Sequence, residues 1–258
     1  MFYIFCHTLL RIGAVLLFGF RVHHYRRGMH PGGWLLLGNH QSHLDPVLHG
    51  LATPAPISFM ARDSLFHNRL FAGLIRGLRA FPVQRGKRDE ASFRITQERI
   101  ANNSPVVIFG EGTRSNDGKI QEIKGGIEIL ARRTKAPIIP FAVAQPILIM
   151  PRGRSLFSVD VHHVVVVIGP AIPASEYEQW ARRTMPAHLR TVLINLHNEA
   201  LAAREKMGPG VTVISRDAVA LFLIWVRFAL GTIGRIKRLL RPAKPKAPKV
   251  RNEEGDDD

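Results

Sequence analysis

The sequence predicts an α/β fold, a layered mixed β-sheet flanked by helices, with apolar membrane-associating helices at both ends of the chain. Between about residues 29 and 210, short apolar runs alternate with longer amphipathic runs, which is typical of strands and helices that take turns in a layered domain. Two strongly apolar stretches flank this region. The length of 258 residues suffices for one large hydrophobic core.

The first apolar stretch, residues 2–20, is nearly long enough to cross a bilayer, which takes about 20 apolar residues. Arg11 lies at its centre, and a central Arg costs about 2.5 to 3.5 kcal/mol on insertion scales. We therefore expect a helix that lies in the membrane interface, with Arg11 reaching toward lipid phosphates. No cleaved signal peptide is expected, because no basic segment precedes this stretch. Arg21, Arg26 and Arg27 favour a cytoplasmic location for the domain that follows.

Within that domain, the apolar runs predict strands near residues 34–37, 57–61, 80–83, 106–109, 138–143 and 159–168. The amphipathic runs predict helices near residues 46–52, 65–77, 91–102 and 126–133. Residues 174–206 also show helical periodicity, and Pro186 should divide them into two helices.

The second apolar stretch, residues 218–234, contains Arg227 and is followed by many basic residues. We expect it to contact the membrane as the first stretch does; a terminal helix docked on the domain is the alternative. The expected division is residues 1–28, an N-terminal membrane-associating helix; 29–210, the α/β domain; 211–241, an apolar and basic membrane-contacting helix; and 242–258, a disordered tail that is first basic and then acidic.

The formal net charge is +16 and the isoelectric point is near 11.1, which predicts attraction to nucleic acid, anionic lipid or an acidic substrate. The placement of charge favours lipid, because no acidic residue precedes Asp45 and basic residues flank the apolar stretches. No nucleic-acid-binding module is evident, so we expect no nucleic-acid partner. Cys6 is the only cysteine, which excludes an intrachain disulfide and a cysteine-based zinc site.

Candidate functional residues first appear at 39–45 (Asn-His-Gln-Ser-His-Leu-Asp), directly after an apolar run. Functional groups of α/β sheets gather at the carboxyl ends of strands. His40 and Asp45 suggest a general base that a carboxylate holds in one tautomer. Residues five apart point about 140° apart on a helix, so a turn must bring the two together. His43 is a competing base, and a capping or surface role is the alternative to catalysis.

A second polar block, residues 109–115 (Phe-Gly-Glu-Gly-Thr-Arg-Ser), also follows an apolar run. Gly112 allows backbone amides to approach an anion, Arg114 offers a planar fork for phosphate, and Thr113 adds a hydroxyl donor. Glu111 is expected to orient the arginine or to accept a hydrogen bond from a substrate hydroxyl. The alternative is a glycine-rich turn with a surface ion pair.

Two basic residues complete the candidate site: Arg85 follows the run at 80–83, and Lys124 precedes a Gly-Gly pair that opens a helix. A phosphate-binding P-loop is not present, because residues 112–119 place one residue too many between the glycines. No metal site is expected, because adjacent histidines such as His162 and His163 point to opposite faces of a strand.

In order and spacing, four blocks resemble the family of 1-acylglycerol-3-phosphate acyltransferases. Residues 39–45 match its H-x4-D block, 81–85 its second block, 109–115 its F-P-E-G-T-R-S block and 136–141 its fourth, so that the resemblance covers residues 34–143. It implies that His40 is the catalytic base and Asp45 its partner. It also implies that four residues help to hold the glycerol-phosphate acceptor: Arg85, Glu111, Gly112 and Arg114.

Together with the apolar stretches and the arginines after the first of them, the resemblance predicts a membrane-associated enzyme, with its catalytic domain on the cytoplasmic side of the cell membrane. Such an enzyme transfers a fatty acyl group from acyl-CoA or acyl-carrier protein to lysophosphatidate and forms phosphatidate, without cofactor or metal. Another lysophospholipid or glycerol 3-phosphate is an alternative acceptor, and a non-catalytic membrane lipid-binding protein is the alternative of another class. Gly110 stands where the family usually has proline, so we expect a more flexible loop, which puts the acceptor preference in question.

Overall fold

The computed structural model describes residues 1–84, 89–149 and 163–207, which all lie within one compact unit, Met1–Ile214. Arg85, His162 and the second apolar stretch lie outside the described residues. The predictions for the segments at 211–241 and 242–258 therefore stay predictions.

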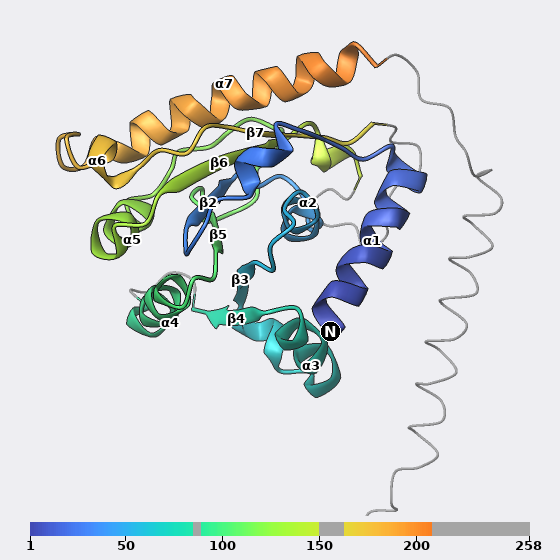
Figure 1. The fold of residues 1–258 in the computed structure, drawn as a ribbon, viewed down its shortest axis with the longest axis horizontal. Coiled ribbons are helices and arrows are strands. Elements are labelled where there is room, and N and C mark those ends of the chain that lie inside the picture. The colour runs from blue at the N-terminus through green and yellow to red at the C-terminus, as the bar shows by residue number, and fades with distance from the viewer. Residues whose placement is uncertain (85–88, 150–162, 208–258) are drawn as a thin grey trace, which may run out of the picture. The chain divides into compact units, whose positions relative to one another are not determined.

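A central sheet organises the described residues (Figure 1). Its strands are β1 (Arg21–His23), β2 (Leu35–Gly38), β3 (Ser58–Arg62), β4 (Ala80–Val83), β5 (Val106–Phe109), β6 (Ile138–Val143) and β7 (Val165–Ile168). They lie in the order β1-β7-β6-β2-β5-β3-β4. All pairs are parallel except β6 with β7. The predicted mixed sheet flanked by helices is confirmed.

The helices connect these strands and cover both faces of the sheet. They are α1 (Phe2–Phe18), α2 (Asp45–Leu51), α3 (Arg69–Gly77), α4 (Glu90–Ala101), α5 (Gly126–Thr134), α6 (Ala174–Tyr177) and α7 (Met185–Glu205). Three 3-10 turns are η1 (Tyr25–Gly28), η2 (Asp63–Phe66) and η3 (Pro146–Leu148).

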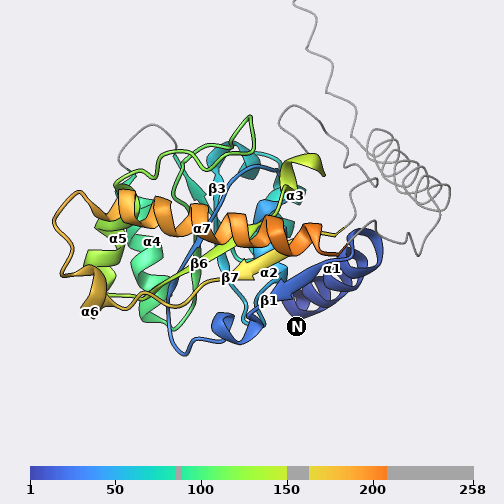
Figure 2. The same cartoon turned by 90° about the horizontal axis from the view of Figure 1, so that it is seen from above.

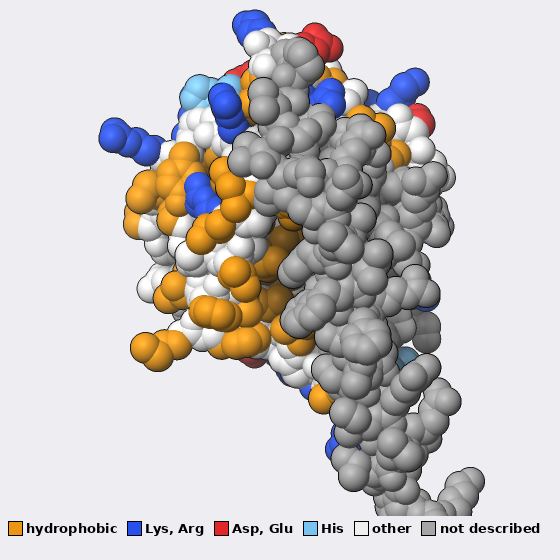
Figure 3. Space-filling view, turned by 90° about the vertical axis from the view of Figure 1, so that its right-hand side faces the viewer, with side chains coloured by type: hydrophobic (Ala, Val, Ile, Leu, Met, Phe, Trp, Pro, Cys, Tyr) orange, Lys and Arg blue, Asp and Glu red, His pale blue; other side chains and the backbone are white. Residues whose placement is uncertain are grey.

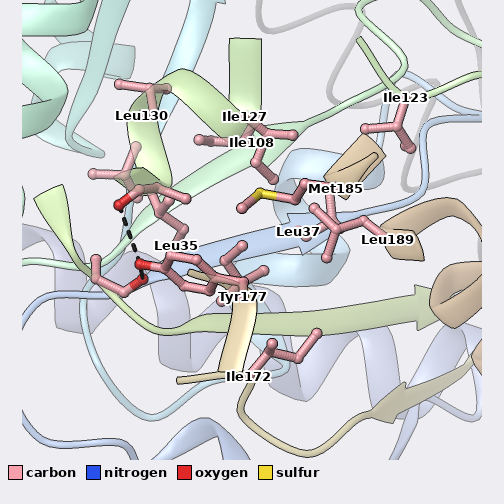
Figure 4. Close-up of a cluster of buried hydrophobic side chains, with 14 of the residues drawn as sticks. Leu35, Leu37, Ile108, Ile123, Ile127, Leu130, Ile172, Tyr177, Met185 and Leu189 are labelled. Atoms are coloured by element: carbon pink, nitrogen blue, oxygen red, sulfur yellow. Dashed lines mark hydrogen bonds between the residues drawn. The ribbon is translucent and has the colours of Figure 1, made fainter. Parts of the chain in front are cut away.

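The core forms two layers because alternate residues of each strand point to opposite faces. Leu36 of β2 packs in one cluster with residues of α1 and α2, whereas Leu35 and Leu37 pack on the other face with residues of α4, α5 and α7. Figure 4 shows this second cluster, in which the Tyr177 hydroxyl donates to the carbonyls of Ala131 and Ala136 at 3.1 and 2.9 Å. Seen from above, α7 runs along the sheet, where it contacts β6 and β7 (Figure 2).

Most elements form where the sequence predicts them, and the differences have local causes. The helix predicted at 65–77 begins only at Arg69, because the Asn68 side chain accepts hydrogen bonds from the amides of Leu70 and Phe71 and so caps α3. Residues 174–206 form two helices, but Pro186 lies in the first turn of α7, where proline is tolerated. The strand predicted at 159–168 is described from residue 163 on, and in this part β7 begins at Val165.

The N-terminal segment contains one helix and one strand. Helix α1 ends at Gly19, which has a left-handed φ of 52°. β1 follows within the segment predicted as a membrane-associating helix, and it pairs with β7. Among the described residues, no helix combines the length and hydropathy that crossing a membrane requires. The Arg11 guanidinium, expected to reach toward lipid phosphates, donates to the Tyr25 hydroxyl at 3.2 Å.

Candidate active site

A histidine and a carboxylate meet where β2 ends and α2 begins. Oδ2 of Asp45 accepts hydrogen bonds from His40 Nδ1 at 2.8 Å and from the amides of Gln41 and Ser42 at 2.6 and 2.7 Å. The three donors explain why the chain turns sharply between the two residues, as their spacing requires. Asp45 is fully buried, and His40 is 7% exposed.

This geometry fixes the tautomer of His40. Because the carboxylate oxygen accepts from Nδ1, the ring proton lies there, and Nε2 keeps a lone pair that can take a proton from another molecule. His43, the competing base, is exposed. Partial burial, together with the positive charge of Arg114, lowers the pKa of His43. In the structure, His40 is the histidine that donates to the buried carboxylate of Asp45.

The ring of Phe109 packs between the rings of His40 and His49. The ring of Phe109, at the end of β5, stacks on the His40 ring with centroids 4.2 Å apart and an interplanar angle of 17°. Phe109 in turn meets the His49 ring edge-on at 5.4 Å. His49 is fully buried, and its Nδ1 bonds the Asp45 carbonyl at 2.7 Å. Burial lowers the pKa of His49, which favours the neutral ring at this position.

The end of β2 requires glycine because His49 lies so close. A Cβ atom on Gly38 would lie 2.5 Å from His49 Nε2, a distance at which one of the two must move. The Asn39 side chain then ties the chain to the neighbouring strand β6. Its Nδ2 donates to the Val143 carbonyl at 3.1 Å, and its Oδ1 accepts from the Val143 backbone amide at 2.9 Å.

The loop after β5 forms hydrogen bonds with both the amide and the carbonyl of His40. Glu111 Oε1 accepts from the His40 amide at 2.7 Å, and the Ser115 amide donates to the His40 carbonyl at 2.8 Å. Glu111 Oε2 accepts from the Gln121 amide at 2.9 Å. Burial raises the pKa of Glu111 to about 7, against the opposing effect of the Gln121 and His40 amides. The carboxylate thus bonds backbone amides in the structure.

The remaining residues of the second block lie beside this pair. Gly112 has a left-handed φ of 69°, and a Cβ there would lie 3.3 Å from Lys124 Nζ, so the lysine side chain passes over the glycine. Thr113 is exposed and Arg114 is half-buried. Gly112, Thr113 and Arg114 therefore lie with Glu111 in one loop, and the Lys124 side chain lies over it. Arg85 lies outside the described residues.

Close packing accounts for glycine at position 110. Gly110 is buried, its carbonyl accepts from the Lys124 amide at 2.8 Å, and an added Cβ would lie 2.9 Å from Ile123 Cγ2. The described residues contain no group of three or more His, Cys, Asp or Glu side chains arranged to hold a metal ion.

Sequence reasoning did not predict the contacts by which several residues build the site. Asn39, Phe109, Ser115 and Gln121 hold His40, its neighbour or Glu111 through the contacts above. Asn39, Phe109 and Ser115 lie within the two polar blocks, so their position in the chain was a usable signal. Gln121 lies outside both blocks and acts through its backbone amide, which no side-chain pattern reveals.

Comparison with known proteins finds similarity to acyltransferases. A family model described as "Acyltransferase" matches residues 20–144. A 1-acyl-sn-glycerol-3-phosphate acyltransferase of Bacillus subtilis is 27% identical over 156 residues, 60% of this chain and 75% of that protein. One of Streptococcus pneumoniae is 31% identical over 116 residues, 44% of this chain and 42% of that protein.

A solved structure has the same fold. The 1-acyl-sn-glycerophosphate (LPA) acyltransferase PlsC from Thermotoga maritima superposes with a TM-score of 0.62 at 24% sequence identity, covering 73% of this chain and 74% of the other. At this identity the likeness concerns the fold.

Proposed function

We propose that this chain is an acyltransferase, which acylates the free hydroxyl of lysophosphatidate, using an acyl thioester as donor and forming phosphatidate; the match to the acyltransferase family model and the likeness to two bacterial acyltransferases support this. The observation that carries the proposal is the buried His40–Asp45 pair, whose geometry leaves His40 Nε2 able to accept a proton. The names of the two bacterial relatives supply the acceptor.

The mechanism follows from the residues present. His40 Nε2 takes the proton of the acceptor hydroxyl as its oxygen attacks the thioester carbonyl, and Asp45 stabilises the imidazolium that forms. The tetrahedral intermediate collapses by breaking its carbon–sulfur bond, and the imidazolium returns the proton to the leaving thiolate. The step has no covalent acyl-enzyme, which agrees with the absence of a G-x-S-x-G elbow from the sequence.

The acceptor phosphate is proposed to bind at the loop after β5. Arg114 supplies a planar guanidinium, Lys124 a point charge, and Thr113 a hydroxyl, while the left-handed turn at Gly112 exposes backbone. Arg85, after β4, is proposed to join them. Anchoring the phosphate fixes the hydroxyl near His40, and such positioning contributes substantially to rate.

The apolar surface of α1 and α3 supports a location on a membrane, which we propose to be the cytoplasmic side of the cell membrane. Exposed side chains on α1 include Phe5 (67%) and Leu9 (59%), and on α3 Leu70 (66%). Neither helix contains an acidic residue. Figure 3 views the side on which α1 lies, and hydrophobic side chains gather there. Large exposed apolar patches mark interaction sites, and the proposed substrates are membrane lipids.

The experiment is acyl transfer by the detergent-purified protein. The donor is a labelled acyl group carried by CoA, as oleoyl-CoA, or by acyl-carrier protein. The acceptor, in separate reactions, is lysophosphatidate, another lysophospholipid or glycerol 3-phosphate. Wild-type protein should form phosphatidate, and His40→Ala should form none while still unfolding cooperatively and binding vesicles. His43→Ala, the matched control, should stay active, because His43 is exposed and His40 holds the buried carboxylate.

Three outcomes would change the proposal. If the protein acylates only one of the other acceptors, the proposed acceptor is wrong but the proposed acyl-transfer mechanism stands. Near-normal transfer by His40→Ala refutes the base. No transfer by the wild type with any donor or acceptor favours the non-catalytic lipid-binding alternative.

A further inference from the structure

Glu111 is part of the block that the family resemblance assigns to acceptor binding, yet its carboxylate lies inside the protein. Glu111 is 1% exposed. Its Oε1 accepts from the amide of His40 at 2.7 Å, and its Oε2 accepts from the amide of Gln121 at 2.9 Å. Because the side chain is enclosed and both oxygens are held by backbone amides, the carboxylate can meet an acceptor hydroxyl only if the side chain moves.

The two amides belong to different segments, which Glu111 joins. His40 follows β2, and Gln121 precedes α5. With the Ser115 amide on the His40 carbonyl at 2.8 Å, the loop after β5 binds both polar groups of the His40 backbone. Asp45 fixes the ring at Nδ1, at 2.8 Å. Glu111 and Asp45 therefore constrain different parts of the same residue, one its backbone and the other its side chain.

We propose that Glu111 is a positioning residue, which holds the His40 backbone so that Nε2 meets the acceptor hydroxyl, and that it does not itself bind the acceptor. The proposal rests on the proposed function for the role of His40. A misplacement of about 1 Å at a reacting group costs about a hundredfold in rate, so a support that acts only on the backbone can still control turnover.

The chemistry of the site explains why this residue is a glutamate. Two N–H groups face the side chain, and only a carboxylate can accept from both. Glutamine at this position would accept from one amide and direct its own N–H toward the other. Aspartate keeps both acceptors but is one methylene shorter, so it cannot hold both bonds at their present lengths.

The experiment measures kcat and the acceptor KM for Glu111→Gln and for the wild type, in detergent with saturating donor. A positioning role predicts that kcat falls by about tenfold to a hundredfold, while the acceptor KM stays within about twofold. The control is Glu122→Gln, which removes an exposed carboxylate from the same segment and should leave both constants near wild type.

A rise of tenfold or more in acceptor KM at near-normal kcat would show that Glu111 binds the acceptor and would overturn the proposal. Unchanged constants would overturn it as well. If Glu111→Gln does not unfold cooperatively, Glu111→Asp decides by the same comparison, with a smaller loss of kcat expected. The wild type separates the two hypotheses: if it acylates nothing, the proposed function has failed, whereas an active wild type makes the variants a test of Glu111 alone.

Discussion

Replacing Asp45 with asparagine separates the charge of the carboxylate from its hydrogen bonds. In the structure Oδ2 accepts from His40 Nδ1, the Gln41 amide and the Ser42 amide. The carboxamide oxygen of an asparagine side chain can occupy the same position and accept from the same donors, so the turn should persist. What the variant lacks is the negative charge beside the imidazolium that forms during transfer.

The size of the effect follows from that charge. Two unit charges about 4 Å apart attract by about 4 kcal/mol at the effective dielectric constant of partly buried pairs. The neutral ground-state imidazole gains little of this, so the attraction acts mainly as the transition state forms. Because each 1.36 kcal/mol is a factor of about ten in rate, Asp45→Asn should lower kcat by about a thousandfold, with little change in the acceptor KM.

Steady-state acyl transfer and thermal unfolding should be measured on Asp45→Asn and Asp45→Ala together. Asparagine should leave the melting temperature close to that of the wild type. Alanine leaves His40 Nδ1 and two buried amides without their acceptor, and each such loss costs about 1 to 3 kcal/mol, so its melting temperature should fall. If Asp45→Asn kept a tenth or more of the wild-type kcat, the carboxylate charge would not stabilise the transition state and the reasoning would be wrong.

The other predictions concern the second polar block. Arg114→Ala should raise the acceptor KM about tenfold and change donor kinetics little, because a phosphate contact made equally before and during reaction affects binding alone; a donor-specific defect in steady-state kinetics would contradict its role. Burial raises the pKa of Glu111 from 4.5 to about 7, so the free energy of unfolding gains a term that is fully present below pH 4.5 and is lost as the pH rises to about 7. At most this term is about 3 kcal/mol. Urea denaturation of wild type and Glu111→Gln at several pH values should show it as a stability difference that changes over this interval, and a constant difference would show that Glu111 titrates normally.

The sequence predicts those parts of the site that depend on short-range pattern. β5 and β6 are continuous apolar runs that each follow a proline, and both form where predicted. The pairing of His40 with Asp45 was predicted because both lie in one short block after a strand, and the spacing required a turn. β1 was missed because its three residues, Arg-Val-His, are too few for an alternating pattern to distinguish a strand from a loop. Its pairing with β7, far along the chain, makes it a strand.

Glu111 shows what the short-range pattern cannot supply. A glutamate beside an arginine, in a glycine-rich block, suggests either a ligand for the acceptor or a partner for the arginine. Its observed partners are backbone amides, and every residue except proline has one. Nothing in the identity of His40 or Gln121 therefore indicates which amide the carboxylate meets. That choice depends on which strands are neighbours and on their register.

Strand register is thus what assembles the site. β2 lies between β6 and β5, parallel to both, with Gly38 opposite Phe109 on one side and Phe141 on the other. Because the strands reach this level together, the residues that follow them emerge at one edge of the sheet. Asn39 meets Val143 there, and His40 meets Glu111. A shift of one residue in the pairing of β2 would turn its side chains to the opposite face and separate both pairs. The buried apolar side chains that fix the register of β2 therefore also position His40, the proposed catalytic base.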